Sequence, residues 1–288
     1  MGLTGRAHLS YHVYMKTSGI ITLTTDFGLS DPYVAAMKGV ILSINPEVCL
    51  VDVTHQISPA AVFQGAAAVL DVFPYFPEGT VHLVVVDPGV GSERRGIVVE
   101  RSKHFFVGPD NGLFWPLVED LASPQIIHLT DSRFFLPHVS PTFHGRDVFA
   151  PVAAHISRGV DPRKMGIPIK DPAMLDVPRP YVRKNVLYGQ VVRVDHFGNL
   201  ITNIHRSDIE SFLGPAQPVV RVGKWVLREI RHVYAVAEEG EPLALYGSSS
   251  HLEIAVNLGR ASERLGTKKR PDQIIGTKVL VKKWQDGT

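Results

Sequence analysis

The sequence predicts an α/β protein with two parts: an N-terminal α/β domain with a largely parallel sheet, and a smaller C-terminal all-β domain that resembles a barrel. Three observations support this prediction. Apolar, β-branched runs alternate with helical patterns up to residue 86. Residues 171–180 contain three prolines and no periodicity, and short strand patterns separated by glycines follow them. We therefore expect an N-terminal extension (1–19), the α/β domain (20–170), a linker (171–188) and the β domain (189–288).

The composition is that of an ordinary globular protein. Of the 288 residues, 44% are hydrophobic and 20% charged, which excludes a long disordered or coiled-coil chain. The net charge of +2 comes without basic blocks, so we expect no nucleic-acid partner. Cys49 is the single cysteine, which excludes a disulfide framework. No apolar run reaches the ~18 to 20 residues that span a bilayer, and residues 1–19 lack the features of a secretory signal. We therefore expect a cytoplasmic protein that does not bind a membrane.

The α/β domain opens with the β-branched run Ile20–Thr25, which predicts a strand buried on both faces. Asp31 and Pro32 then resemble an N-cap followed by proline at the first helical position, and predict a helix over residues 32–44. The alternation of strand and helix patterns implies parallel strands with right-handed crossovers, a Rossmann-like arrangement. The other predicted elements are strands at 48–53 and 80–86, a helix from Ser58-Pro59 to residue 72, short strands at 96–100 and 105–107, and a helix at 147–156.

The pattern changes after the linker to short strands with frequent glycines and turn residues. This pattern is typical of a mostly antiparallel small barrel or sandwich. The predicted strands lie at residues 189–194, 200–204, 219–222, 243–246, 252–256 and 277–282.

Polar residues gather where buried strands end, which is where parallel sheets bind their ligands. Asp87 ends the third predicted strand, and the turn at residues 88–92 that follows it contains two glycines. Such a turn can fold Arg94 back toward Asp87. On these residues alone, an aspartate that caps a turn and a solvated arginine explain the segment equally well. The segment lacks the Gly-Lys-Ser/Thr of a phosphate-binding P-loop.

Asp26 ends the first predicted strand, and residues 26–31 stand where a dinucleotide-binding protein has its glycine-rich fingerprint. A carboxylate at this place suits two ribose hydroxyls better than a phosphate, because it accepts hydrogen bonds and repels anions. We therefore expect Asp26 to contact a ligand and Asp31 to cap the helix.

Two further clusters allow both a functional and a structural interpretation. His144 precedes Gly145 and a predicted helix, and could transfer protons, although a structural histidine is the simpler interpretation. Phe197 could stack on a base while Asn199 binds its polar atoms, but an ordinary turn explains both residues. The histidines show no metal-ligand spacing such as HExxH, so we expect no metal site.

Together these clusters resemble the S-adenosylmethionine (SAM) hydroxide adenosyltransferases, the adenosine-forming SAM hydrolases, which are relatives of the fluorinases and chlorinases. The resemblance runs in order from about residue 20 to residue 266. The matching stretches are TTDFG (24–28), DPYVA (31–35), VDVTH (51–55), FPEGTVH (76–82), VDPGVGS (86–92), PDNG (109–112), TFHGRD (142–147), DHFGNLITN (195–203) and LEIAVN (252–257).

The resemblance implies the two-domain fold and a homotrimer in which SAM lies between the N-terminal domain of one subunit and the C-terminal domain of its neighbour. It also implies that water attacks the ribose C5′, so that SAM is hydrolysed to adenosine and L-methionine. SAM is then the substrate, and no cofactor is expected.

The resemblance also assigns roles to particular residues. It places the Asp-Arg-His set of the hydrolase branch on Asp87, Arg94 and His144. The halogenases lack an aspartate at the first of these positions, and the fluorinase has a halide-binding serine where Gly145 stands, so both residues favour water as the nucleophile. The implied substrate contacts are Asp26 with the ribose hydroxyls, Asp31 near the methionine amino group, Phe143 and Phe197 at the nucleoside, Asn199 at the adenine or the edge of the ligand, and Asn257 and Leu258 against the base.

One segment departs from the family pattern Asn-Ser-x-Gly, because residues 247–250 are Gly-Ser-Ser-Ser. The contacts to the methionine carboxylate therefore stay open. We expect Asp87 and His144 to accept or relay the proton of the attacking water while Arg94 holds Asp87, and the sequence leaves open which of the two is the base. The alternatives are a sensor that binds SAM or adenosine without turnover, a SAM-dependent halogenase, and a metal-dependent hydrolase of phosphorylated nucleosides.

Overall fold

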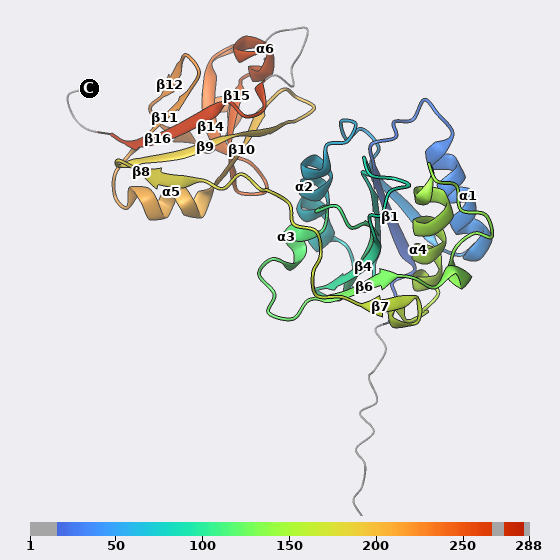
Figure 1. Ribbon diagram of the computed structural model, residues 1–288. Helices are drawn as coiled ribbons and strands as arrows, with labels where there is room; N and C mark the ends of the chain where they lie inside the picture. The colour runs from blue at the N-terminus through green and yellow to red at the C-terminus, as the bar shows by residue number, and fades with distance from the viewer. Residues whose placement is uncertain (1–15, 267–273, 285–288) are drawn as a thin grey trace, which may run out of the picture. The chain divides into compact units, whose positions relative to one another are not determined.

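The computed structural model describes residues 16–266 and 274–284 (Figure 1). The chain divides into two compact units, Met1–Leu175 and Asp176–Thr288, and this boundary falls inside the predicted linker. Residues 1–15 of the predicted extension lie outside the described residues. Thr17 and Ser18 belong to the first unit, because Thr17 Oγ1 donates to the carbonyl of Ser157 (3.0 Å) and the Ser18 amide donates to that of Gly79 (3.1 Å).

The first unit contains a seven-stranded, partly parallel sheet with the strand order β2-β1-β3-β5-β4-β6-β7. The first four strands in this order are parallel neighbours, whereas β4, β6 and β7 pair antiparallel. The antiparallel half begins at the two-residue turn Ser102-Lys103, where both φ angles are positive and no crossover fits. The strands are β1 (Ile20–Thr25), β2 (Cys49–Thr54), β3 (Val81–Val85), β4 (Gly96–Arg101), β5 (His104–Pro109), β6 (Gln125–Leu129) and β7 (Gly166–Pro168).

Helices cover both faces of this sheet, with α1 (Tyr33–Ile44) and α4 (Ala150–Ser157) on one face, and α2 (Val62–Val72) and α3 (Trp115–Val118) on the other (Figure 1). Strand β3 shows the resulting alternation. Leu83 and Val85 pack with α1 and α4, whereas Val84 and Val86 pack with α2 and α3. Burial on both faces explains why this strand is apolar at almost every position.

Both predicted helix starts with a cap followed by proline are wrong. Helix α1 begins at Tyr33, so that Pro32 is the N-cap, and no side chain caps the helix. The exposed Asp31 is too early in the chain to reach the free amides of the first turn. Helix α2 begins at Val62 and not at residue 59, because Ala60 has a φ of +65°, which a right-handed helix does not accommodate.

The second unit contains a nearly barrel-shaped, nine-stranded sheet with the order β12-β11-β16-β9-β10-β15-β14-β13, and β8 pairs with β9. All pairs are antiparallel except β13 with β14. The strands are β8 (Tyr181–Arg183), β9 (Val186–Val194), β10 (Leu200–His205), β11 (Pro218–Val222), β12 (Trp225–Leu227), β13 (Ile230–Arg231), β14 (Pro242–Tyr246), β15 (His251–Val256) and β16 (Lys278–Lys283).

Two helices of the second unit were not predicted, α5 (Arg206–Leu213) and α6 (Ala261–Leu265). Helix α5 packs against β10 and β16 and buries Ile209 and Leu213 in the core of the unit. This spacing of four residues was the available sequence signal for α5. Strand β8 and the start of β9 lie within residues 171–188.

Candidate active site

Asp87 lies at the carboxyl edge of the first sheet, two residues after β3. The side-chain amide of Asn111 donates to the carbonyl of Val86 (2.9 Å) and so fixes the backbone directly before Asp87. Gly91, in the turn that follows, has a φ of +77°, and a Cβ there would lie 2.3 Å from the carbonyl oxygen of Pro141. Only glycine fits this position, and the turn it permits returns the chain toward Asp87.

The structure brings Asp87 and His144 each within hydrogen-bond distance of Arg94, which lies between them. Arg94 Nε donates to both carboxylate oxygens of Asp87 at 3.0 Å, and Arg94 Nη2 forms an ion pair with Asp87 Oδ2. Arg94 Nη2 also lies 2.9 Å from His144 Nδ1. The side chains of Asp87 and Arg94 are only 5% and 10% exposed, and the ring of Phe149 packs on the guanidinium. Arg94 thus joins the carboxylate and the imidazole in one shielded cluster.

This geometry determines where the proton of His144 lies. An arginine N–H can only donate, so His144 Nδ1 must accept, and the neutral ring carries its proton on Nε2. Burial and the charge of Arg94 lower the pKa of His144, which keeps the ring neutral near pH 7. His144 therefore offers a donor at Nε2. Within the described part of the chain, Asp87 Oδ1 accepts from Arg94 Nε alone and keeps capacity for a further donor.

His144 stands at the start of a π-helical turn, η3 (Gly145–Phe149), that leads into α4 where a regular helix was predicted. Such turns hold one extra residue and are frequent at functional sites. The buried Asp147 anchors this turn, since it accepts from the Ser140 amide (2.8 Å) and from Arg146 Nε (2.6 Å). Burial opposes ionisation, but these hydrogen bonds lower the pKa of Asp147, so that it stays charged.

Arg94 and His144 also line a cavity of about 430 Å³ in the first unit. Its wall includes Glu93, His128 and Phe135. Two members of the cluster, Arg94 and His144, therefore face this cavity, whereas Asp87 lies behind Arg94 and does not line it.

Asp26 lies at the end of β1, the strand next to β3. Phe27, the following residue, packs edge-to-face on Phe143 with ring centroids 5.9 Å apart. A Cβ at Gly145 would lie 3.5 Å from both rings, so these aromatic residues adjoin the turn that carries His144. Asp31 is exposed, and it makes no ion pair or hydrogen bond within residues 16–266 and 274–284. The structure thus links Asp26 and Phe143 to the edge of the cluster but not Asp31.

Four residues predicted to contact the nucleoside, Phe197, Asn199, Asn257 and Leu258, line one pocket in the second unit. The pocket has a volume of about 580 Å³. Phe197 is 71% exposed and Leu258 is 82% exposed, so apolar side chains stand open to solvent at this pocket. The structure therefore gathers residues 58 to 61 positions apart in the chain, each placed by a loop at a strand end.

Tyr234 lines the same pocket and was not predicted. Asn199 Nδ2 donates to Asp195 Oδ2 (2.8 Å) and lies 3.3 Å from the hydroxyl of Tyr234, which donates to Glu253 Oε2 (3.2 Å). Burial and the nearby Glu253 raise the pKa of Tyr234 to about 12, so the phenol is a neutral donor. No motif marks Tyr234, and an aromatic residue in a loop between strands was the available signal.

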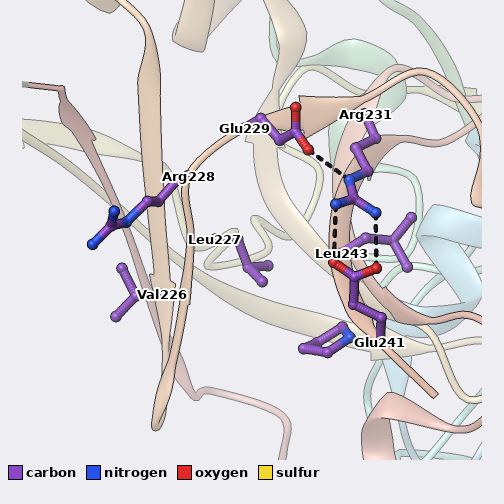
Figure 2. A pocket seen from close by; sticks show the side chains of 8 residues that line it. Val226, Leu227, Arg228, Glu229, Arg231, Glu241 and Leu243 are labelled. Carbon is purple, nitrogen blue, oxygen red and sulfur yellow. Dashed lines mark hydrogen bonds and ion pairs between the residues drawn. The ribbon is translucent and has the colours of Figure 1, made fainter. Parts of the chain in front are cut away.

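A second hollow in this unit, of about 430 Å³, is lined by residues 226–229, 231 and 241–243 (Figure 2). Figure 2 shows Arg231 between two carboxylates, with Nε donating to Glu229 (2.7 Å) and Nη2 to Glu241 (2.9 Å). Asn257 Nδ2 donates to the backbone carbonyl of residue 237 (2.7 Å). Arg231 Nη1 also donates to the carbonyl of Val236 (3.3 Å), so these bonds hold the short turn η5 (Tyr234–Val236) that carries Tyr234 at its pocket.

The structure explains the glycine in the Gly-Ser-Ser-Ser segment at residues 247–250. A Cβ at Gly247 would lie 1.7 Å from Glu253 Oε1, so a larger residue would displace this carboxylate. Glu253 is the acceptor of Tyr234. Glycine at position 247, where the family pattern has asparagine, therefore leaves room for the carboxylate of Glu253. The contacts to the methionine carboxylate stay open.

Within residues 16–266 and 274–284, no three His, Cys, Asp or Glu side chains gather as ligands of a metal ion. The expected absence of a metal and of a cofactor stays a prediction. None of the helices in this described part has the length and apolar character needed to cross a membrane.

Comparison with known proteins gives matches to both units. The model of the SAM hydroxide adenosyltransferase N-terminal domain matches residues 21–166, and that of the C-terminal domain matches residues 189–273. Proteins named (R)-S-adenosyl-L-methionine hydrolase from Salinispora tropica and Thermus thermophilus are 38% and 39% identical, over 85% of this chain and 93% and 94% of theirs. A fluorinase from Actinoplanes sp. is 31% identical over 66% of this chain and 73% of its own.

Two solved structures share the fold. An uncharacterized conserved protein from Thermotoga maritima superimposes with a TM-score of 0.82 at 34% identity, over 91% of this chain and all of that chain. A conserved hypothetical protein from Thermus thermophilus gives a TM-score of 0.70 at 36% identity, over 91% and 98%. With both domains matched in order, the chain belongs to the SAM hydroxide adenosyltransferase family, of which the fluorinases are more distant relatives.

Proposed function

We propose that this chain is an enzyme that hydrolyses SAM to adenosine and L-methionine. The observation that carries the proposal is the contact of Asp87, Arg94 and His144 beside a cavity. Four relatives that are 36–39% identical and named (R)-S-adenosyl-L-methionine hydrolase support it. We extend the preference stated in that name, for the (R) sulfonium epimer, to this chain.

Water attacks the ribose C5′ of SAM in this reaction. The C5′–O bond forms as the C5′–S bond breaks, and the electron pair of that bond goes to sulfur, which leaves as the neutral thioether of methionine. The leaving group therefore needs no proton, and the difficulty lies in aligning a weak nucleophile opposite the C–S bond. Such alignment can lower a barrier by roughly 7 to 11 kcal/mol at best.

Asp87 receives the proton that the attacking water loses. Its Oδ1 retains a lone pair toward a further donor, whereas His144 Nδ1 is occupied by Arg94. His144 then donates from Nε2 to the attacking oxygen and orients it. Arg94 holds both partners and stabilises the negative charge that develops on the oxygen. The proton passes from Asp87 to solvent after product release.

Residues of both units bind the substrate in this proposal. Asp26 accepts from the ribose hydroxyls, and Phe143 packs beside the nucleoside. Phe197 stacks on the adenine, Asn199 contacts its edge, and its other face lies against Asn257 and Leu258. Asp31 attracts the methionine ammonium, for which its exposed carboxylate is free.

We further propose that the enzyme is a cytoplasmic homotrimer with its active sites at subunit interfaces. The exposed Phe197 and Leu258 support an assembly, because apolar side chains beside a pocket favour a covering partner. Light scattering after gel filtration should give about three times the chain mass of 31.7 kDa. A monomer at working concentrations would contradict the assembly, and fractionation of expressing cells tests the compartment.

The decisive experiment incubates the purified chain with each SAM epimer and separates the products by chromatography. We expect adenosine and methionine in equal amounts, from the (R) epimer at the higher rate. Binding without adenosine would indicate a sensor, and 5′-halo-adenosine in chloride or fluoride would indicate a halogenase. Loss of activity with a chelator would indicate a metal-dependent hydrolase.

A further inference from the structure

The strand next to β1 contains an irregularity beside Asp26. Strand β2 holds one extra residue, Val53, between the residues that pair with β1, Asp52 and Thr54. In a regular strand, side chains three positions apart point to opposite faces. The extra residue shifts this alternation and brings Asp52 and His55 to the same side, with His55 Nε2 3.0 Å from Asp52 Oδ1.

Asp52 connects His55 to helix α1. Its second oxygen, Oδ2, accepts from Lys38 Nζ at 2.6 Å. Burial opposes ionisation, but the contacts with Lys38 and His55 lower the pKa of Asp52, which therefore bears a negative charge. The contact of His55 Nε2 with Asp52 departs from the orientation of a straight hydrogen bond, so we treat it as an electrostatic contact.

The other side of His55 holds the turn that contains Asp26. His55 Nδ1 lies 2.9 Å from the hydroxyl of Thr25, and this hydroxyl accepts from the Phe27 amide at 3.2 Å. The backbone carbonyl of His55 accepts from the Gly28 amide at 2.8 Å. His55 thus contacts the residues on both sides of Asp26 and is itself only 4% exposed.

The proton order in this network follows from its two ends. The carboxylate of Asp52 favours a proton on His55 Nε2, so Nδ1 accepts from the hydroxyl of Thr25. The set of Thr25, His55 and Asp52 is not a nucleophilic triad, for two reasons. Its imidazole is reversed relative to such triads, in which Nε2 faces the hydroxyl. Thr25 is also fully buried, so no substrate reaches it.

We propose that His55 is a positioning residue that sets the carboxylate of Asp26 for the ribose hydroxyls. The inference rests on the proposed function, because Asp26 contacts the substrate only there. Asp26 Oδ2 is already engaged by the Ala60 amide (2.9 Å), so the turn held by His55 decides where Oδ1 points. A small rotation of this turn would misplace the acceptor without unfolding the sheet.

Two substitutions at His55 separate its two contacts. His55→Asn places an amide near Nδ1 and keeps the partner of Thr25, whereas His55→Gln places one near Nε2 and keeps the partner of Asp52. Both remove the ring to a similar degree. Thr25→Val is a third variant that removes only the hydroxyl and conserves the shape.

The readout is the preference of the protein for adenosine over 2′-deoxyadenosine, measured by titration calorimetry, together with KM and kcat for SAM. We expect His55→Gln and Thr25→Val to lose about fivefold or more of this preference and to raise KM by a similar factor, with kcat within about threefold. We expect His55→Asn to stay within about twofold of wild type on each measure.

Equal losses in His55→Asn and His55→Gln, or no loss in Thr25→Val, would overturn the inference. If His55→Gln does not fold, Thr25→Val carries the test. Failure of the proposed function has a different signature, since a wild type that prefers adenosine but releases none from SAM leaves the role of His55 intact. A wild type without any preference for adenosine overturns the inference whatever its turnover.

Discussion

The two units contain functional surfaces of opposite character. In the first, Arg94 is hydrogen-bonded to both Asp87 and His144, and the side chains of Asp87 and Arg94 are at most 10% exposed. In the second, Phe197 and Leu258 stand more than two-thirds exposed beside an open pocket. Buried, satisfied charges hold their geometry before any ligand arrives, whereas exposed apolar side chains gain by being covered. We therefore expect substitutions in the first unit to change kcat and substitutions in the second unit to change KM.

The largest effect should come from Asp87→Asn, which keeps the shape and removes the proton acceptor. We expect kcat to fall by about 10²- to 10⁴-fold while the KM for SAM changes by less than about threefold. Adenosine release in a timed assay measures both. If Asp87→Asn instead raised KM and left kcat unchanged, the first unit would contribute to binding and not to turnover. The melting temperature serves as control, since the buried Arg94 loses its ionic partner.

Acid should destabilise the first unit before the second. His82 is 1% exposed, its ring contacts His104, and burial together with the charge of His104 lowers the pKa of His82 to about 3. The unfolded chain binds a proton near pH 6.5, so stability is complete above that pH and falls as the pH decreases toward 3. The full loss is on the order of 5 kcal/mol.

Hydrogen exchange resolved by peptide checks this expectation. Between pH 6.5 and 4, protection should fall in β3 and β5 of the first unit more than in β10 and β15 of the second. His82→Gln should flatten this pH dependence. Equal losses of protection in both units would show that the histidine pair does not set the acid limit.

Phe197→Ala should affect binding alone. Stacking of an aromatic ring on a base contributes about 1 to 3 kcal/mol, so we expect KM to rise by about 5- to 150-fold with kcat nearly unchanged. Because Phe197 is 71% exposed, the melting temperature should stay within about 2 °C. Phe197→Tyr is the matched control and should retain affinity. A fall in kcat would show that the second unit also takes part in the chemical step, and would contradict the separation of turnover and affinity between the units.

The smallest effect should come from Arg231→Gln, which removes the ion pairs that hold the loop of Tyr234. Arg231 is 20% exposed and its carboxylate partners 36% and 63%, so solvent weakens these ion pairs. We expect the KM for SAM to rise by about two- to threefold without a change in kcat. Tyr234→Phe serves as the comparison, because it removes the hydroxyl and leaves the loop in place. No change in either variant would mean that Tyr234 does not contribute to the pocket.

Local sequence patterns predicted the features that depend on neighbouring residues. Strand β1 lies within the predicted residues, because an apolar β-branched run needs no distant partner to be recognised. The glycine turn after Asp87 allowed Arg94 to fold back, and the structure shows this contact, although the local pattern fitted a solvated arginine equally well. The family resemblance then joined Phe197 to Asn257 across a pocket that no spacing rule could connect.

Features that depend on distant contacts were missed. Helix α2 begins late because Asp26 holds the amide of Ala60, a contact between residues 34 positions apart. The loop that carries Tyr234 to the pocket is held by the ion pair of Arg231 with Glu241, and no sequence motif marks this pair. Asp31 was predicted as an N-cap from a local pattern that proved misleading. Helix α1 begins at Tyr33 with Pro32 as its N-cap, one residue too late for Asp31 to cap it.

The π-helical turn after His144 makes the direction of this side chain depend on the number of residues in the turn. Each residue of an α-helix advances the chain by about 100° around the axis. Losing one codon here would therefore leave helix α4 intact and swing His144 away from Arg94 by about that angle. A point substitution keeps the number of residues in the turn, although one at Asp147 would remove the hydrogen bonds that anchor it. In this chain, a single deletion in the turn would therefore break the contact of His144 with Arg94, and we expect it to abolish the proposed hydrolysis.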